Sequence, residues 1–230
     1  MIKKLFTIAF ISFLCAALNA QDNKTFRFGL KGGLNFSTMS CDEHGNTVKD
    51  RLTSFNLSGL VDIPIHKDII CIQPSLGLSG KGVEYKLKES EDGDHGKIKV
   101  TPYYAELQTN FLFKAPLSDN FKFYVGAGPY LSAGLFGKTT IEGRFFGEEV
   151  NIDKNIHYTS KKVDYQEPYH WSNLKRFDYG YNLLLGVELS RYIVSASYTQ
   201  GVANVQPKSK KSGDASGKNG VFSVSVGLYL

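Results

Sequence analysis

Apolar and polar residues alternate with a period of two through most of this chain. In the segment DYGYNLLLGVELS, every second residue from Tyr179 to Leu189 is apolar, and the residues between them are glycine or polar, among them Asn182 and Glu188. Residues 221–230 repeat the pattern. Because successive side chains of a strand point to opposite faces, this alternation predicts amphipathic β-strands.

The same rule predicts eight strands, many of them long. Their ranges are 26–40, 53–65, 69–88, 98–115, 121–139, 177–190, 192–205 and 221–230. Most reach or exceed the roughly 9 to 11 residues that a tilted strand needs to cross a bilayer. After residue 20, no stretch offers the roughly 20 consecutive apolar residues of a membrane helix.

The connections between these strands alternate between short and long. Those after the second, fourth and sixth strands are PIHKD, PLSDN and SR. Those after the first, third, fifth and seventh are polar and longer, and cover residues 41–52, 89–97, 140–176 and 206–220. An up-and-down meander therefore gathers the short turns on one side. Bacterial outer-membrane barrels have this asymmetry, with short periplasmic turns and long extracellular loops.

Aromatic residues of the apolar face fall into two groups, one at each end of the predicted strands. The group near the short turns comprises Phe26, Phe28, Phe113, Phe121, Phe123 and Tyr192. The group near the long loops comprises Phe36, Phe55, Tyr103, Tyr179, Tyr181, Tyr198 and Phe222. Two aromatic girdles around an aliphatic band are typical of a surface that faces lipid.

The sequence therefore predicts an all-β fold, an eight-stranded antiparallel up-and-down transmembrane β-barrel. The alternative is a soluble lipocalin-like barrel or a β-sandwich, whose strands also alternate but turn their apolar face inward.

The first 20 residues have the features of a secretory signal peptide. The segment MIKKLFTIAFISFLCAALNA carries Lys3 and Lys4, then an apolar stretch and a small residue before Gln21. We expect residues 1–20 to be cleaved and residues 21–230 to form one barrel domain in the outer membrane.

The charge of the exported chain is nearly balanced. The sequence has 27 Lys and Arg against 22 Asp and Glu, and loss of Lys3 and Lys4 leaves 25 against 22. This modest excess, together with export, disfavours nucleic acid as a partner. We expect contact with outer-membrane lipid and with other envelope proteins, a monomeric state, and no cofactor.

The strands and their order resemble a known family. The segments FGLKGGLNFS, YYAELQTNFLFK, FYVGAGPYLSAG, DYGYNLLLGVEL and FSVSVGLYL, in this order, are similar to the PorT-like outer-membrane β-barrel proteins of Gram-negative bacteria. The resemblance covers most of the chain after the leader and implies an eight-stranded barrel. A few relatives serve a protein-secretion and gliding apparatus, so the resemblance also implies an accessory role in secretion.

Charged residues occupy positions that face the interior of the predicted barrel. They include Arg27, Lys31, Asp62, Glu106, Lys114 and Glu188. An eight-stranded barrel has room for its own side chains or for one small ligand, and buried charges must be paired. We expect these residues to form a network of ion pairs and hydrogen bonds that plugs the lumen. The alternatives are a polar binding pocket and a narrow path for small solutes.

An enzyme is the runner-up to a structural or binding protein. Outer-membrane barrel enzymes that act on envelope lipid or peptides place a histidine beside serine or acidic partners at the extracellular rim. The candidates here are His157, His170, Ser160, Ser172, Asp164 and Glu167. The predicted strands carry no histidine, although catalysis favours rigid elements. No group of residues has metal-ligand spacing, so we expect no metal site.

The longest loop, 140–176, is rich in aromatic residues. Candidates for contact with a partner are Phe145, Phe146, Tyr165, Tyr169 and Trp171. Aromatic side chains are effective anchors in protein interfaces, which favours a docking surface. The alternative is a strand pair above the membrane with an aromatic cluster of its own.

Two cysteines follow the leader, Cys41 and Cys71. The predicted strands place them at opposite ends of the barrel, whereas a disulfide needs Cα atoms about 4 to 7 Å apart. We therefore expect no disulfide between them.

Overall fold

The computed structural model describes residues 26–40, 47–66, 68–87, 95–145, 148–159, 161, 172–207 and 217–230. Its strands are β1 (Arg27–Ser40), β2 (Thr47–Asp50), β3 (Leu52–His66), β4 (Ile70–Gly80), β5 (Val83–Leu87), β6 (His95–Ser118), β7 (Phe121–Phe145), β8 (Glu148–Asn155), β9 (His157–Tyr158), β10 (Asn173–Leu174), β11 (Phe177–Leu189), β12 (Tyr192–Gly201) and β13 (Lys218–Tyr229). Among these described residues, no helix is long and apolar enough to span a membrane.

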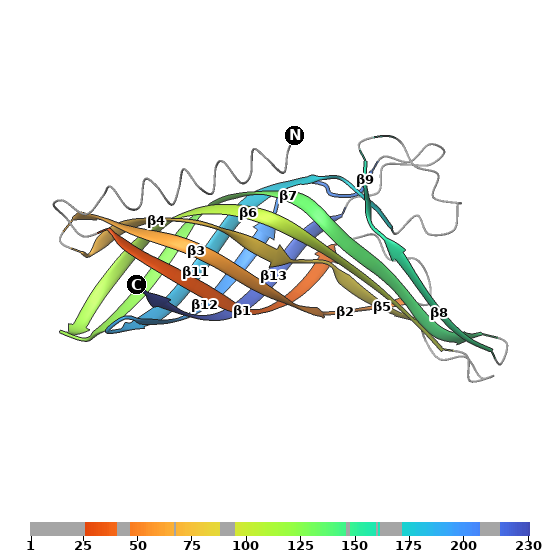
Figure 1. Ribbon diagram of the computed structural model, residues 1–230, viewed down its shortest axis with the longest axis horizontal. Helices are drawn as coiled ribbons and strands as arrows, with labels where there is room; N and C mark the ends of the chain where they lie inside the picture. Colours follow the sequence, from red (N-terminus) through yellow and green to blue (C-terminus); the bar gives the residue numbers. More distant parts are fainter. Residues whose placement is uncertain are drawn as a thin grey trace.

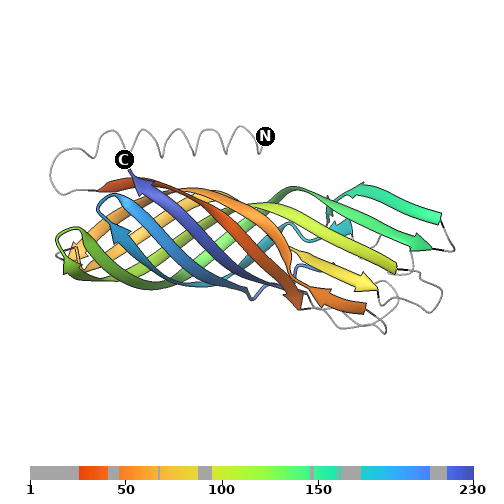
Figure 2. The same cartoon turned by 90° about the horizontal axis from the view of Figure 1, so that it is seen from below.

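Eight of the strands form a closed antiparallel barrel. The hydrogen-bonded order is β6-β4-β3-β1-β13-β12-β11-β7, and pairing of β6 with β7 closes the ring. The first and last strands of the barrel, β1 and β13, lie side by side (Figure 2), with Leu34 opposite Val224. The predicted eight-stranded up-and-down β-barrel is confirmed.

The short turns gather at one end of the barrel, at the left of Figure 1. They join β3 to β4, β6 to β7, and β11 to β12. Asp68 and Ser190 lie in two of these turns and have φ angles of 56° and 55°. Such angles let an antiparallel pair reverse direction within a few residues.

At the opposite end, several strands continue past the barrel rim and form a flat extension (Figure 1). Strands β6 and β7 are 24 and 25 residues long, more than twice the roughly 9 to 11 residues that span a bilayer. Their outer halves pair with β5 and β8, and β2 pairs with β5. We call the sheet of β2, β5, outer β6, outer β7 and β8 the extracellular sheet.

Three of the predicted boundaries were wrong because the rim interrupts the alternation. The predicted strand 69–88 is divided into β4 and β5 at Lys81 and Gly82, where Gly82 has a φ of 130°. The loop predicted at 140–176 contains the end of β7 and strands β8 to β10, and the strand predicted at 192–205 ends at Gly201.

A β-bulge lies at the rim between β6 and β7. Tyr103 pairs with Phe136 and Tyr104 pairs with Gly134, so Leu135 has no partner. Leu135 and Phe136 are consecutive and both are exposed. The extra residue therefore changes the alternation along β7. Odd-numbered residues point outward before the bulge, and even-numbered residues point outward after it.

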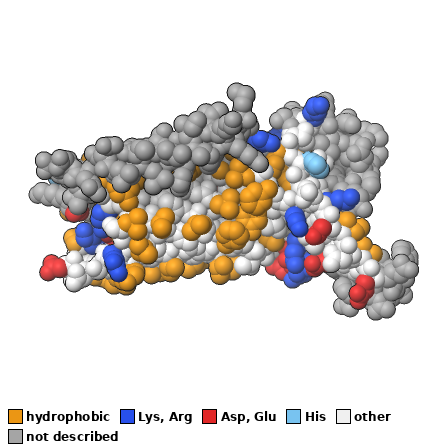
Figure 3. Space-filling view, in the orientation of Figure 1, with side chains coloured by type: hydrophobic (Ala, Val, Ile, Leu, Met, Phe, Trp, Pro, Cys, Tyr) orange, Lys and Arg blue, Asp and Glu red, His pale blue; other side chains and the backbone are white. Residues whose placement is uncertain are grey.

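The outer wall of the barrel is apolar and exposed. Leu57, Leu107, Leu183 and Val226 are 58%, 48%, 50% and 63% exposed, respectively. Figure 3 shows apolar side chains over the barrel wall and charged ones toward its two ends. Because the apolar face points outward, a soluble barrel with an apolar interior is excluded.

One apolar cluster lies inside the ring of strands, and a second lies at its extracellular end. The inner apolar cluster comprises Leu60, Cys71, Leu112, Tyr124, Leu184, Ile193 and Tyr229. The cap cluster comprises Met39, Val83, Tyr85, Val100, Ile156, Leu174 and Val205, with Ile98 and Tyr158 packed against it. Cys71 is a free, buried thiol, and Cys41 lies outside the described residues, so the absence of a disulfide stays a prediction.

If the outer wall of the barrel faces lipid, the cost of introducing a charge on it should depend on how deep the residue lies in the bilayer. Replacing Leu183 with Arg, at the middle of β11, should lower the free energy of unfolding in lipid vesicles by about 2–4 kcal/mol, since a charge is costly at the bilayer midplane. The measurement is a denaturant titration of the folded barrel.

The matched control is Leu117→Arg, which adds the same charge near a short turn, where the residue is 67% exposed. Its effect should be about 0–1 kcal/mol, because the cost falls toward the interface. Equal effects at the two positions would contradict the assignment.

Candidate functional site: the barrel lumen and the extracellular sheet

An inner charge cluster of Arg27, Asp62, Lys114 and Glu188 lies at the short-turn end of the lumen. Arg27 and Lys114 each form ion pairs with both carboxylates. The Lys114 ammonium lies 2.5 Å from Asp62, and the Arg27 guanidinium lies 2.9 Å from Glu188. Both carboxylates and Lys114 are almost fully buried. Two cations thus neutralise two anions in a shared network.

Tyr229 covers this cluster from β13. Its hydroxyl donates a hydrogen bond of 2.9 Å to Glu188, and its ring lies 4.1 Å from the Arg27 guanidinium carbon. The contact places a cation over an aromatic face, which adds to the attraction within a desolvated cluster. Tyr229 therefore links the inner charge cluster to the inner apolar cluster.

An outer charge cluster of Lys81, Glu106 and Asp178 lies toward the extracellular rim. The Lys81 ammonium is 2.6 Å from Glu106 and 3.1 Å from Asp178. Tyr130 donates a hydrogen bond of 3.0 Å to Asp178, and Asn219 donates another of the same length. The Lys81 ammonium also lies 4.2 Å from the Tyr130 ring. One cation therefore serves two carboxylates.

Amide and hydroxyl side chains connect the strands between the two charge clusters. Asn35 donates to Ser79 at 3.1 Å and accepts from Asn56 at 2.6 Å. On the opposite wall, Asn182 donates to Asn110 at 3.1 Å. These neutral groups satisfy one another, as buried polar groups must.

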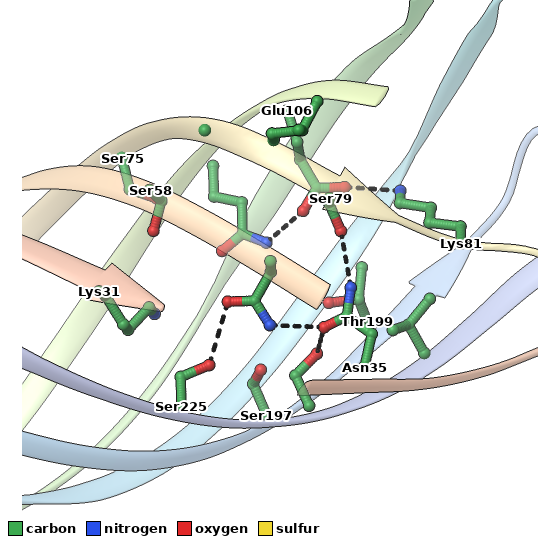
Figure 4. Close-up of a pocket in the computed structure, with 16 residues that line it drawn as sticks. Lys31, Asn35, Ser58, Ser75, Ser79, Lys81, Glu106, Ser197, Thr199 and Ser225 are labelled. Atoms are coloured by element: carbon green, nitrogen blue, oxygen red, sulfur yellow. Dashed lines mark hydrogen bonds and ion pairs between the residues drawn. The ribbon is translucent and has the colours of Figure 1, made fainter. Parts of the chain in front are cut away.

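A polar cavity of about 40 Å³ lies within this region (Figure 4). We call it the chamber. Lys31, Ser58, Ser75 and Ser197 line it, together with Glu106 and other polar side chains. By its volume the chamber holds about one or two water molecules. Within the described part of the chain, Lys31 forms no ion pair or hydrogen bond at contact distance.

All six predicted lumen residues lie in the barrel interior, where they are divided among three sites. Arg27, Asp62, Lys114 and Glu188 meet in the inner cluster, Glu106 joins the outer cluster, and Lys31 faces the chamber. The analysis of the sequence missed Lys81 and Asp178. Both have the parity of the lumen face, since Lys81 follows Gln73, Ser75 and Ser79 at even intervals and Asp178 precedes Asn182 and Glu188 in the same way.

The polarity of both faces inverts where the strands leave the barrel. On β6, Leu107 faces outward from the barrel, whereas Lys97 and Lys99 continue the same face beyond the rim. The opposite face changes from Glu106 in the lumen to Ile98 in the cap cluster. This inversion marks the level at which lipid gives way to water.

Cross-strand ion pairs cover the charged face of the extracellular sheet. Lys97 lies 2.9 Å from Glu84, and Lys99 lies 3.7 Å from Glu142. Lys86 pairs with Asp50 across β5 and β2, and its hydrogen bond holds the pKa of the Asp50 carboxyl below its usual value. Except for the buried Glu84, these side chains are partly exposed to water, so each pair stabilises the sheet only slightly.

A row of apolar residues crosses the other face. Tyr85 pairs with Ile98, Ile98 with Ile141, and Ile141 with Ile152, from β5 to β8. Tyr85 is buried in the cap cluster, whereas Ile141 and Ile152 are half-buried. Tyr158 covers the same cluster, and burial raises the pKa of its phenol.

Most of the predicted loop contacts lie outside the described residues. Phe145 is the last residue of β7 and pairs through its backbone with Glu148. Phe146, Tyr165, Tyr169 and Trp171 are not described. The strand pair β7–β8 matches the alternative in which this loop extends the sheet above the membrane.

The candidate catalytic residues are described only in part. His157 is exposed in β9, and Ser172 is 4% exposed with a hydroxyl that has no hydrogen-bond partner within the described ranges. His170, Ser160, Asp164 and Glu167 lie outside them. No group of three or more metal-ligating side chains occurs in the described part of the chain.

Because the charges of the inner charge cluster are buried, removing one of its cations should strongly destabilise the folded barrel. Replacing Lys114 with Met should lower the free energy of unfolding by about 3–5 kcal/mol, because two buried carboxylates would share Arg27 alone. A denaturant titration in detergent micelles measures the change.

Lys86→Met serves as the matched control, since it removes a lysine whose side chain is half exposed to water. Its stability should stay close to that of the unchanged protein. If the two variants unfolded at the same denaturant concentration, the inner cluster would not have the role assigned to it.

Comparison with known structures finds other outer-membrane proteins with low sequence identity. The attachment invasion locus protein Ail of Yersinia pestis, in complex with the heparin analogue sucrose octasulfate, is 14% identical with a TM-score of 0.39, and the match covers 90% of this chain and 100% of that one. OprG from Pseudomonas aeruginosa is 11% identical with a TM-score of 0.45, covering 90% and 97%. Neisserial surface protein A is 11% identical with a TM-score of 0.41, covering 88% and 97%.

At such identities and TM-scores, these likenesses say nothing about the function of this chain. A comparison with curated proteins finds no match. The family model described as outer membrane protein beta-barrel domain matches residues 19–206. The match covers most of the chain, which therefore belongs to this family of outer-membrane β-barrel proteins.

Proposed function

We propose that this protein is a non-enzymatic outer-membrane barrel that binds another envelope protein through its extracellular sheet, while its lumen stays closed. The observation that carries the proposal is the continuation of β6 and β7 past the rim into a sheet whose strand order ends at β8.

The packing of the lumen supports a closed interior. From the short turns outward, the lumen contains the inner charge cluster with the inner apolar cluster beside it, then the chamber with its amide and hydroxyl side chains, and then the outer charge cluster. The cap cluster covers the extracellular end. Tyr104, Lys114 and Val205 have no exposed surface. The paired charges and the close packing support a closed lumen and disfavour a channel.

The edge of the extracellular sheet supports binding to an extended polypeptide. Within the described residues, β8 pairs with β7 on one side and with no strand on the other. An unpaired edge presents backbone N–H and C=O groups to which a partner strand can add. The apolar row ends at Ile152 on this edge, and a partner strand would continue it.

The two faces suit such a partner in different ways. The charged face keeps the sheet soluble above the membrane, because its lysines and Glu142 are partly exposed to water. The apolar face would gain further burial from an apolar residue beside Ile152. We propose that the partner supplies an extended segment with alternating apolar residues, and that Phe145, Phe146, Tyr165, Tyr169 and Trp171 add contacts around it.

The resemblance to PorT-like proteins supports a specific form of this role. It suggests that the partner belongs to a protein-secretion apparatus, and that this chain is an accessory of that apparatus. We further propose that residues 1–20 are cleaved on export and that the barrel acts as a monomer in outer-membrane lipid.

Binding at the β8 edge predicts that a photo-crosslinking amino acid at Val150, on the apolar face, forms a defined adduct with one envelope protein in the native host. Ile152→Lys should reduce the yield of this adduct about tenfold or more, because a charge in the apolar row opposes strand addition. The adduct is measured on a denaturing gel and identified by mass spectrometry.

Asn151→Lys is the matched control, since it adds the same charge to the neighbouring position on the opposite face. Its adduct yield should stay near that of the unchanged protein, and both variants should keep the heat-dependent gel migration of a folded barrel. An equal loss in both variants, or no adduct at all, would argue against the β8 edge as the binding site.

A closed lumen predicts the absence of ion conduction. The purified barrel, inserted into planar lipid bilayers at neutral pH, should show no stable conductance steps, whereas a porin inserted by the same procedure shows them. Reproducible steps from the barrel would favour the small-solute channel instead.

A further inference from the structure

Glu106 lies between two lysines but contacts only one of them. Its carboxylate is 2.6 Å from the Lys81 ammonium, and it also accepts a hydrogen bond of 2.7 Å from Gln108. Lys31 lies on the other side of the chamber. Its ammonium has no contact partner of its own in the described residues.

The charges of the lumen balance only when Lys31 is included. The inner charge cluster has two cations and two carboxylates. In the outer cluster, Lys81 alone faces Glu106 and Asp178. A protonated Lys31 supplies the missing positive charge, but it does so from a distance. If Glu106 moved to Lys31, Lys81 would keep Asp178, and each lysine would have one carboxylate.

The register leaves the space between Lys31 and Glu106 open. Lys31 pairs with Ser58, Ser58 with Gly77, and Gly77 with Glu106 on successive strands. Only a hydroxymethyl group and a hydrogen atom therefore stand between the two long side chains along this row. A Cβ at Gly77 would overlap the carbonyl oxygen of Leu57, so the position has to remain glycine.

The chamber occupies this open space (Figure 4). Serine hydroxyls line it at Ser58, Ser75 and Ser197, and none of the three forms a hydrogen bond with the described residues. With room for about one or two water molecules, the chamber would keep the Glu106 carboxylate solvated while it turns. The move is a rotation of side chains and requires no change of strand pairing.

We propose that Glu106 is a movable carboxylate with two cation positions, Lys81 in the outer charge cluster and Lys31 across the chamber. In the arrangement seen in the structure, Glu106 ties Lys81 to β6. In the second arrangement, Glu106 joins Lys31, and Lys81 remains bound to Asp178 on β11 alone.

Lys81 connects this exchange to the extracellular sheet. It lies with Gly82 between β4 and β5, at the point where the barrel wall ends and the sheet begins. Its side chain reaches into the lumen and contacts both β6 and β11. Release of Glu106 would remove one of the two ion pairs that hold this junction, so the exchange acts as a latch between the lumen and the extracellular sheet.

The test combines a double-mutant cycle between Lys81 and Lys31 with a crystal structure of the Lys81→Met variant. Lys81→Met alone should fold, and its crystal structure should show the Glu106 carboxylate in contact with Lys31. When Lys31 is also replaced by Met, Glu106 loses both cations. Removal of Lys81 should then raise the unfolding equilibrium constant about tenfold more in the K31M background than in the unchanged protein, the coupling expected of groups that share a partner.

The control cycle pairs Lys81→Met with Lys122→Met. Lys122 is also a cation of the barrel, but its ammonium lies 4.0 Å from Asp68 at the short-turn end. The effects of these two substitutions should add. If the two cycles gave equal coupling, the coupling would depend only on the total charge of the barrel. The proposed exchange of Glu106 between two lysines would then be wrong. So would a K81M structure in which Glu106 stays away from Lys31, or one in which a bound ion fills the chamber beside Lys31.

A second measurement does not depend on the folding of K81M. In the unchanged barrel, labelled with ¹⁵N-lysine and ¹³C-glutamate and folded into lipid, solid-state NMR should detect a Lys Nζ to Glu Cδ contact of about 4 Å or less that disappears in K31M. No loss of signal in K31M would mean that Glu106 does not visit Lys31, and the proposal would fail.

Discussion

The hydrogen-bonded seam between β1 and β13 is the constraint on which the rest of the structure depends. In lipid there is no water to satisfy backbone N–H and C=O groups, so a sheet can cross the bilayer only as a closed ring. The first and last barrel strands complete that ring, and Leu34 then lies beside Val224 on an apolar wall. Once the wall faces lipid, the alternate residues have to form a polar interior.

The polar interior follows from closure, but its arrangement is specific. Because eight strands leave little room, each buried charge must find its partner on another strand. Arg27 and Lys114 share two carboxylates, and this network holds β1, β3, β6 and β11 together. The outer cluster is less symmetric, since Lys81 serves two carboxylates while Lys31 has none at contact distance. This asymmetry gives the lumen a second arrangement that differs only in side-chain positions.

The alternation of residues was sufficient to predict the barrel, its short turns and the faces of its strands. It could predict lumen residues such as Arg27 and Glu188, because parity alone decides which way a strand residue points. It could not predict which charges meet, since partners such as Arg27 and Glu188 are 161 residues apart in the sequence. It also failed at the rim. Gly82 breaks one strand and the unpaired Leu135 shifts another, and both depend on neighbours distant in sequence.

The bulge at Leu135 also restricts how this chain can vary in evolution. A single residue decides that Phe136 and Glu142 share the outward face while Thr139 and Ile141 point inward. Loss of that residue would turn the outer half of β7 over, placing its charges in the cap cluster and its isoleucine in water. Insertions and deletions in the outer halves of β6 and β7 should therefore occur in steps of two residues. The extracellular sheet can therefore change its length in pairs of residues, whereas the side on which each of its two faces lies is set by the barrel.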